Sequence, residues 1–275
     1  MIRLMTAEDV PAGMRLKKAA GWNQTTQDWE NVLALEPKGC WVYEIDEVVA
    51  GSATAVCYGQ HMAWIGMVLV LPEYRGQGIA RQLMRHALQY IEERGVPYVK
   101  LDATDMGRPL YEQLGFVHEI VIERWAGTAS GQPDGKGPVS ISVDNMAAIS
   151  APDRAAFGAN RTALLRQLIQ SFPMDTASLP GGYVMGRPGE NEYFLGPCVA
   201  ENEDEARRLV AHLLARHAGK RVFWDLLPAN EHAVSLARSF GFEPLRKLSR
   251  MARPLAGCPS GDVGRVFAAA GFEYG

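Results

Sequence analysis

The chain contains few cysteines, and they are not spaced as a redox or metal-binding motif. Cys40, Cys57, Cys198 and Cys258 are scattered through 275 residues without a C-x-x-C pair. This spacing argues against a disulfide framework and against a structural zinc site. We therefore expect reduced thiols and no bound metal ion.

Long apolar runs and an excess of positive charge are also missing. No stretch is long and apolar enough to span a bilayer, and the first residues, MIRLMTAED, lack the apolar core of an export signal. The formal net charge of -3 gives no general attraction to nucleic acid. We expect a cytoplasmic globular protein that binds neither nucleic acid nor a membrane.

The most informative stretch covers residues 70–83 and reads VLPEYRGQGIARQL. An apolar strand runs into a charged loop with two glycines, Gly76 and Gly78, and apolar residues then recur at helical spacing. Glycine permits a positive φ and the close approach of a ligand. The free N–H groups at the start of a helix bind anions, and the helix dipole adds to this attraction. The layout predicts a phosphate site.

Several kinds of nucleotide-binding loop contain such glycines. A dinucleotide-binding unit needs a third glycine where this chain has Arg81, and the predicted hairpin before the loop does not suit its strand order. Asp102, in the following strand, would suit such a unit. A Walker A loop needs Gly-Lys-Ser/Thr, which does not follow here. A glycine turn that only reverses the chain is the remaining alternative on the loop alone.

Hydrophobic periodicity and breaker residues predict a regular order of elements in the first half of the chain. The order is helix, helix, hairpin, strand, glycine loop with helix, strand, short helix and strand. The expected ranges are 6–20, 25–36, 40–45 with 48–56, 63–71, 79–94, 98–103, 109–114 and 116–125.

The sequence repeats itself at an offset of 126 residues. This offset aligns Leu83, His86, Leu88 and Gly115-Phe116 with Leu209, His212, Leu214 and Gly241-Phe242. A period this long indicates two copies of a domain. We predict domains at residues 1–126 and 138–253, joined by a Gly- and Ser-rich linker at 127–137. A tail at 254–275 is too apolar to be free and should pack on a domain.

The two copies are not chemically equivalent. Residues 75–79, RGQGI, align with residues 201–205, ENEDE, which removes both glycines and puts acids where an anion would bind. Tyr111 aligns with Ala237. We expect the second copy to have lost the phosphate site and the chemistry of the first.

Two motifs resemble the acyl-coenzyme A core of the GNAT superfamily of N-acetyltransferases. The first is V-x-P-x-x-R-G-x-G-I-A from Val70, and the second is L-Y-x-x-L-G-F from Leu110. Residues 21–24 (GWNQ) and 107–111 (GRPLY) are similar to the tandem-domain bacterial branch. The resemblance implies an α/β (α+β) fold of two tandem GNAT-like domains, the second degenerate. Each would be a mixed, mostly antiparallel twisted sheet flanked by helices.

The resemblance implies acetyl-coenzyme A (acetyl-CoA) as co-substrate. Backbone N–H groups from Gln77 to Arg81 would bind its pyrophosphate, and Arg75 would add positive charge. The strand before the loop would pair with the pantetheine amides, and one of its N–H groups would polarise the thioester carbonyl. The cofactor-binding residues would be Val68, Leu69, Val70, Arg75, Gly76, Gln77, Gly78, Ile79, Ala80 and Arg81.

The resemblance also implies catalytic groups. Tyr111 would protonate the departing thiolate, a transfer that needs orientation because a phenol has a reference pKa of about 10 and a thiol one of about 8.5. Many members of the superfamily carry a glutamate in the strand before the glycine loop, but residues 63–67 of this chain read AWIGM. His61 and Asp102 are the available substitutes, and an ordinary solvated or structural role is the alternative for each.

On the acceptor side, Trp22 would stack on or enclose part of the substrate and Asn23 would bind it by hydrogen bonds, unless Trp22 is a core residue between two helices. The expected activity is acetyl transfer to a primary amine of a small molecule. Direct attack in a ternary complex is expected, because no cysteine adjoins a convincing base. The alternatives are a non-catalytic acyl-CoA-binding or regulatory protein and a nicotinamide-dependent enzyme. A duplicated chain suits either a monomer or a homodimer.

Overall fold

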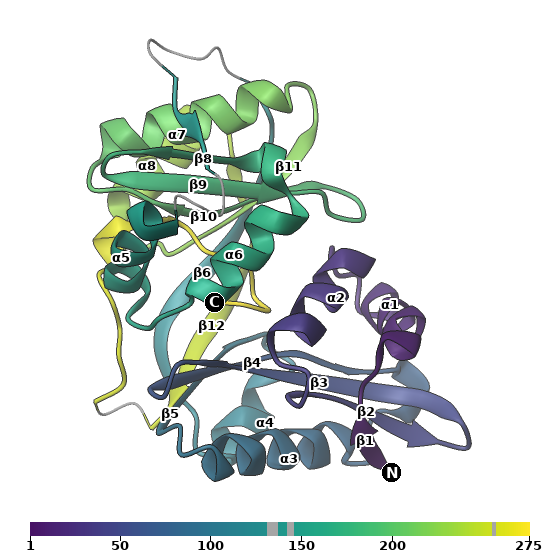
Figure 1. Cartoon of the computed structure of the whole chain (residues 1–275). Coiled ribbons are helices and arrows are strands. Elements are labelled where there is room, and N and C mark those ends of the chain that lie inside the picture. The colour runs from purple at the N-terminus through teal and green to yellow at the C-terminus, as the bar shows by residue number, and fades with distance from the viewer. Residues whose placement is uncertain (131–136, 142–145, 255–256) are drawn as a thin grey trace.

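The computed structural model describes residues 1–130, 137–141, 146–254 and 257–275 (Figure 1). Its first half follows the predicted order of elements. The bounds are β1 Ile2–Leu4, α1 Val10–Ala19, α2 Thr26–Leu35, β2 Cys40–Ile45, β3 Val48–Tyr58, β4 Met62–Val70, α3 Ile79–Glu93, β5 Tyr98–Ala103, α4 Arg108–Gln113 and β6 Val117–Thr128.

The second half repeats much of this order, and the repeat agrees with the offset found in the sequence. The bounds are β7 Val139–Ser140, α5 Met146–Phe157, α6 Thr162–Ser171, β8 Thr176–Leu179, β9 Gly182–Arg187, β10 Tyr193–Val199, α7 Glu203–Arg216, β11 Arg221–Leu226, α8 Glu231–Ser239, β12 Glu243–Arg253 and β13 Val266–Ala268. At the offset of 126 residues, α7, α8 and β12 correspond to α3, α4 and β6.

Helices cover both faces of the sheet in each half (Figure 1). In the first half, α1 and α2 lie on one face and α3 and α4 on the other. α2 begins at a capping box in which the backbone N–H of Thr25 donates to Asp28 Oδ2 at 2.7 Å. α3 buries residues at helical spacing, among them Leu83, Ala87 and Ile91, against the sheet.

The strands of the described residues join in one sheet, with β13 attached to β10. The order is β1-β2-β3-β4-β5-β12-β6-β11-β10-β9-β8-β7. Only β4 with β5 and β10 with β11 pair in parallel within this sheet. The prediction of a mixed, mostly antiparallel sheet flanked by helices is confirmed.

The two halves exchange their last strands. β12 of the second half lies between β5 and β6, and it pairs antiparallel with β5, with Arg250 opposite Asp102. β6 of the first half pairs with β11, with Trp125 opposite Trp224. Each half therefore completes its sheet with help from the other. A domain boundary at residue 126 separates the two copies in the sequence, but the sheet continues from one copy to the other.

The predicted linker and tail are described only in part. Residues 127–128 of the linker belong to β6, and residues 131–136 lie outside the described residues. In the tail, residues 255–256 also lie outside them, and β13 pairs with β10.

The last residues of the tail run between the two halves. Trp64 Nε1 donates a hydrogen bond to the Phe272 carbonyl at 2.9 Å, and the Tyr58 hydroxyl donates to the Tyr274 carbonyl at 2.8 Å. The Tyr274 hydroxyl donates to the Asp28 carbonyl at 3.1 Å. The Nε2 of Gln24 also donates to Glu273 Oε2 at 2.9 Å, so several side-chain hydrogen bonds fix the tail to the first half. None of the helices within the described residues is long and apolar enough to cross a membrane.

Candidate active site

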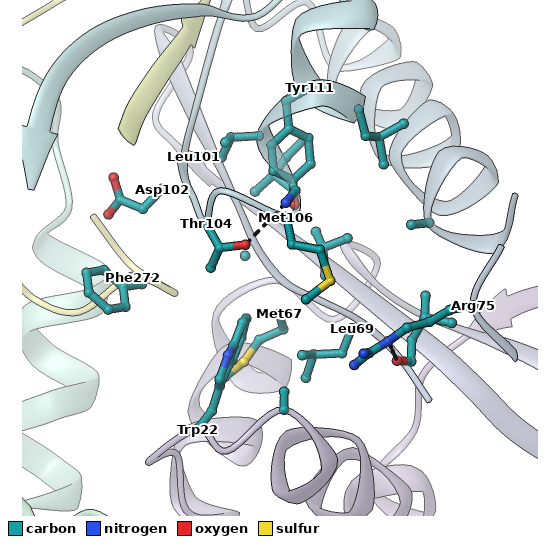
Figure 2. A pocket seen from close by; sticks show the side chains of 18 of the residues that line it. Trp22, Met67, Leu69, Arg75, Leu101, Asp102, Thr104, Met106, Tyr111 and Phe272 are labelled. Carbon is teal, nitrogen blue, oxygen red and sulfur yellow. Dashed lines mark hydrogen bonds between the residues drawn. The ribbon is translucent and has the colours of Figure 1, made fainter. Parts of the chain in front are cut away.

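A pocket of about 810 Å³ opens where two parallel strands separate (Figure 2). The pairing of β4 with β5 ends at Trp64 and Lys100, although both strands continue. Residues 65–70 of β4 and 101–102 of β5 line the space between them. The divergence exposes backbone groups of both strands to the pocket, because they no longer bond to each other.

The glycine loop forms one end of this pocket. Gly76 and Gly78 have φ angles of 79° and 76°, in the left-handed region that favours glycine. A Cβ added to either would meet no heavy atom within 4 Å. Gly78 is the N-cap of α3, so the N–H groups of the first helical turn lack partners within the helix. Open space and free donors thus meet at a helix N-terminus, where an anion is favoured.

Most of the residues predicted to bind the cofactor line the pocket. They are Val68, Leu69, Val70, Arg75, Gly76, Gly78, Ile79, Ala80 and Arg81. Gln77 is not among the lining residues. The Nε of Arg75 donates to the Val70 carbonyl at 3.2 Å, which holds this side chain beside the loop.

The middle of β4 contains a β-bulge at Met67. Ser52 of β3 pairs with Leu69 and Thr54 pairs with Gly66, so the bulge adds an extra residue to β4. Met67 has a φ of 49°, and its carbonyl accepts a hydrogen bond from the Ser52 hydroxyl at 2.7 Å. Met67 and Val68 have no partner in the register of β3 and β4, and both line the pocket. The sequence gives no signal for the bulge, since methionine does not favour a positive φ.

Tyr111 of α4 lies on the wall of the pocket opposite Trp22 (Figure 2). Its side chain packs edge-on against Phe116, and a Cβ on Gly107 would approach its ring to 2.9 Å, so glycine provides the room it needs. Burial raises the pKa of Tyr111 to about 12. Within the described residues its hydroxyl makes no hydrogen bond, which leaves the proton available to a ligand.

Trp22 and Asn23, predicted together as acceptor residues, have different surroundings. Trp22 is half-buried and lines the pocket. Asn23 is buried against the second half, where its Nδ2 donates to the Glu192 carbonyl at 2.8 Å. Its Oδ1 accepts from the backbone N–H groups of Asn191 and Glu192 at 3.0 and 3.1 Å. Asn23 therefore joins the two halves and is not among the lining residues.

Asp102, one of the two predicted bases, lines the pocket but has a partner. Its Oδ1 and Oδ2 each accept a hydrogen bond from Arg250 at 2.9 Å. Its side chain is fully buried, and burial raises its pKa, although Arg250 opposes the shift. Each carboxylate oxygen of Asp102 thus has Arg250 as a hydrogen-bond partner.

His61, the other predicted base, is not brought to the pocket. It is exposed in the turn before β4 and is absent from the lining residues, because the pocket lies at the far end of that strand. Six residues of extended chain separate it from Met67, which corresponds to roughly 20 Å. Asp105, which sequence reasoning missed, does line the pocket and has no ion pair among the described residues. It lies in the loop between β5 and α4.

Comparisons with known proteins agree with this geometry. The model of the acetyltransferase (GNAT) family matches residues 9–116, and the model of an acetyltransferase (GNAT) domain matches residues 149–267. The chain belongs to the GNAT family of acetyltransferases. Its two matched regions stand in tandem, as the internal repeat predicts, and the resemblance that the two motifs indicate is confirmed.

Several relatives of this GNAT acetyltransferase extend over most of its length. The Bacillus subtilis protein named "Uncharacterized N-acetyltransferase YitH" is 26% identical over 223 residues, 77% of each chain. A putative acetyltransferase from Pyrococcus horikoshii has a TM-score of 0.85 at 22% identity and covers 100% of this chain and 95% of its own. A tandem GNAT protein from the clavulanic acid biosynthesis pathway has a TM-score of 0.65 at 16% identity, over 92% and 97% of the two chains. These structures share the fold.

The second half of this acetyltransferase contributes to the end of the pocket away from the glycine loop. The contributing residues are Arg246, Lys247 and Leu248 of β12 and Phe272 of the tail. Figure 2 shows Phe272 and Asp102 on the side opposite Arg75. Sequence reasoning missed all four, because no local motif shows that β12 inserts beside β5.

The second copy of the GNAT fold lacks an equivalent phosphate site at α7. Asn202 is the N-cap of that helix, and its side chain accepts from the Glu205 backbone N–H at 3.0 Å. Glu203, Asp204 and Glu205 form the first turn. Acidic side chains thus occupy the helix N-terminus that in α3 remains open, and they repel a phosphate there.

Proposed function

We propose that this acetyltransferase transfers the acetyl group of acetyl-CoA to a primary amine of a small molecule, by direct attack in a ternary complex. One observation carries the proposal. A single pocket contains the glycine loop at one end, Tyr111 in its wall, and residues of the second half at the other end. Both substrates can therefore occupy it together, with their reacting atoms near the centre.

The glycine loop is proposed to bind the pyrophosphate of acetyl-CoA, as family membership implies. The N–H groups from Gln77 to Arg81 would donate to it, and Arg75 would add charge. Residues 68–70 of β4 would bond to the pantetheine amides, because β4 has separated from β5 there. The residues present fit the group: the loop offers open space above two glycines with positive φ.

The bulge at Met67 is proposed to stabilise the negative charge that develops on the thioester oxygen. A backbone N–H that points into the pocket, free of the ladder, can act as such a donor. Ser52 holds the bulge in place through its hydrogen bond to the Met67 carbonyl. The donor is therefore fixed before substrate binds, which avoids reorganisation during the reaction.

Tyr111 is proposed as the hydrogen-bond donor and general acid for the departing sulfur. With its pKa at about 12 and a thiol at about 8.5, full transfer in isolation is uphill by roughly 5 kcal/mol. A short, oriented hydrogen bond and the proton released by the attacking amine offset this difference. One proton leaves the amine nitrogen and one reaches the sulfur, so the overall reaction balances.

The amine must lose a proton before or during attack. Asp102 is bound to Arg250 on both oxygens, so we propose that it positions β12 and does not act as the base. His61 lies outside the pocket and has no part in this proposal. The proton passes instead to water in the open pocket, with Asp105 as the lining carboxylate that has no ion pair among the described residues.

Calorimetric titration with acetyl-CoA tests cofactor binding. Gly76→Ala and Gly78→Ala should weaken binding at least 10-fold, because alanine at this φ costs about 1–2 kcal/mol and moves the loop N–H groups. Gly95→Ala is the matched control, since Gly95 has a φ of 69°, open space and no place in the pocket. Equal affinity for acetyl-CoA in wild type and in all three glycine variants would contradict a cofactor site at the glycine loop.

Release of free thiol with a panel of primary amines tests catalysis. Tyr111→Phe should lower kcat by about 10²–10⁴-fold and leave the dissociation constant of acetyl-CoA within about twofold. The alternative, a non-catalytic acyl-CoA-binding protein, is favoured by one observation: residues 63–67 of β4 read AWIGM and lack the glutamate that many members of the superfamily carry in this strand. Binding of acetyl-CoA without turnover of any amine would support that alternative.

A further inference from the structure

The acceptor end of the pocket contains an arginine without a charged partner. Arg246 of β12 lines the pocket, and among the described residues it makes no hydrogen bond or ion pair. Its Nε is enclosed without a hydrogen-bond acceptor. The neighbouring arginines differ, since Arg124 binds both oxygens of Asp225 at 2.7 Å and Arg250 binds both oxygens of Asp102 at 2.9 Å. A buried donor of a charged group left in this state is costly.

The side chain of Arg246 lies on the pocket face of β12. Arg246, Leu248 and Arg250 alternate along the strand, so their side chains leave the same face. Leu248 lines the pocket. The Cζ of Arg246 lies 5.1 Å from the ring centroid of Phe272, another lining residue. This contact holds the Arg246 guanidinium against a ring that also lines the pocket.

The charged side chains around Arg246 do not neutralise its positive charge. Arg124 lies opposite it in the register of β6 and β12 and packs on the same Phe272 ring, at 4.4 Å. Asp225, which faces both arginines, is already bound by Arg124. Burial and then Arg124 lower the pKa of Arg246, and Asp225 opposes them. A bound anion would relieve this repulsion.

The phosphates of acetyl-CoA do not fit as the partner of Arg246. The glycine loop, Arg75 and Arg81 lie at the other end of the pocket. Figure 2 places Phe272, on which Arg246 stacks, across the pocket from Arg75. The reacting centre near Met67 and Tyr111 lies between them. An anion at Arg246 therefore belongs to the second substrate.

We propose that the acceptor amine carries a negatively charged group, a carboxylate or a phosphate, and that Arg246 binds this group. The inference rests on the proposed function and narrows its substrate class. A guanidinium binds a carboxylate through two parallel hydrogen bonds, and it binds a phosphate in the same way. Amino acids, ω-amino acids and aminoalkyl phosphates are thus acceptors, and uncharged amines of the same shape are poor ones.

Matched acceptor pairs test this class directly. Each amino carboxylate is compared with its carboxamide, and each aminoalkyl phosphate with the corresponding amino alcohol, at saturating acetyl-CoA. We expect kcat/KM to favour at least one acidic member by about 10- to 100-fold, the size of a charge-assisted hydrogen bond. The carboxylate and phosphate arms show which anion the site accepts. Equal kcat/KM within every pair would overturn the proposal.

Variants of Arg246 test the residue. Arg246→Met should raise the KM of the acidic acceptor about 10- to 100-fold, change kcat little, and abolish the preference over the uncharged partner. Arg246→Lys should keep part of the preference for the acidic acceptor. Arg238→Met is the matched control, because Arg238 also stacks on an aromatic ring, that of Trp125 at 5.8 Å, and lies outside the pocket. If Arg246→Met lowers kcat/KM equally for the acidic acceptor and for its uncharged partner, the role of Arg246 is merely structural.

A binding measurement separates this inference from the proposed function. With coenzyme A present, N-acetylated amino acids and N-acetyl aminoalkyl phosphates, with their uncharged counterparts, are titrated into wild type and Arg246→Met. We expect an acidic product to bind wild type at least 10-fold more tightly than the variant. If no amine is acetylated but an acidic product binds wild type more tightly than Arg246→Met, the proposed function is wrong and the anion site at Arg246 is supported. If neither a preferred acidic acceptor nor such binding is found, the inference itself is overturned.

Discussion

Asp102 and Arg250 form a two-point ion pair between β5 and β12, strands that belong to different halves of the chain. The two hydrogen bonds are both 2.9 Å long, and the Arg250 guanidinium also stacks on Trp64, with its Cζ 4.6 Å from the ring centroid. The pair lies beside the acceptor end of the pocket. The pair joins the exchanged strand to β5, and Arg246 and Leu248 of that strand line the pocket.

Breaking this pair should cost stability more than it costs catalysis. Asp102→Asn leaves the buried Arg250 without a counter-charge, which lowers the free energy of unfolding by about 3–5 kcal/mol. We expect kcat to fall less than 10-fold, whereas loss of a general base costs about 10²–10⁴-fold. Urea unfolding and thiol release measure the two effects. A large fall in kcat of Asp102→Asn with unchanged stability would instead support Asp102 as the general base.

The neighbours Trp22 and Asn23 should respond oppositely to substitution. Trp22→Ala removes a pocket wall and should raise the acceptor KM about 10-fold, with little change in stability. Asn23→Ala leaves two backbone donors at Asn191 and Glu192 without their acceptor and should cost about 1–3 kcal/mol. Initial rates and thermal unfolding distinguish them. A raised acceptor KM in Asn23→Ala at full stability would instead place Asn23 on the substrate.

Gly66 leaves space for the tail of the chain. A Cβ at this position of β4 would lie 3.0 Å from the Cα and from the carbonyl oxygen of Glu273. Gly66→Ala should therefore lower the free energy of unfolding by about 1–3 kcal/mol and raise the acceptor KM, because the displaced tail carries Phe272. The dissociation constant of acetyl-CoA should not change. An effect on acetyl-CoA alone would show that the strand, and not the tail, has moved.

The stability of the protein should depend on Tyr111 at alkaline pH. Burial raises its pKa to about 12 from an ordinary value near 10, so the neutral phenol is favoured in the folded state. Its contribution is complete below pH 10 and is lost as pH rises toward 12, by about 2–3 kcal/mol in total. Tyr111→Phe lacks this loss. Between pH 8 and pH 11 the unfolding free energy of wild type should therefore fall relative to that of Tyr111→Phe.

No acetyl-enzyme should accumulate. Burial raises the pKa of the Cys40 thiol to about 12 and that of Cys57 to about 11, and none of the four cysteines lines the pocket. A thiol attacks only as its thiolate, so these groups are inert at neutral pH. Mass spectrometry after incubation with acetyl-CoA alone should show an unmodified chain, and Cys57→Ala should keep full activity. A stoichiometric, hydroxylamine-sensitive acetyl adduct would contradict direct attack.

The glycine-loop end of the pocket could be predicted because its parts are consecutive in the chain. A strand, two glycines and an amphipathic helix determine a local geometry through φ, helix capping and backbone donors. Tyr111 follows at a fixed spacing, and the internal repeat identifies the second, acidic copy. These features need no knowledge of how distant segments meet.

The catalytic base and the acceptor residues could not be predicted in the same way. Asp102 had the right position in the sequence, but only the structure gives it Arg250 as partner. His61 precedes the right strand, yet an extended strand carries it away from the pocket. The bulge at Met67 has no sequence signal, because a non-glycine residue takes a positive φ only where the surrounding sheet holds it.

The sequence by itself therefore determined the family, the duplication and the glycine loop with the helix that follows it. The tertiary structure alone decided which strand lies beside β5, since β6 and β12 are copies of one element and either could pair there. The exchange brings Arg246 and the partner of Asp102 from the second half into the first. Contacts between strands far apart in sequence depend on which of these two strands pairs with β5, and no local sequence pattern predicts this pairing.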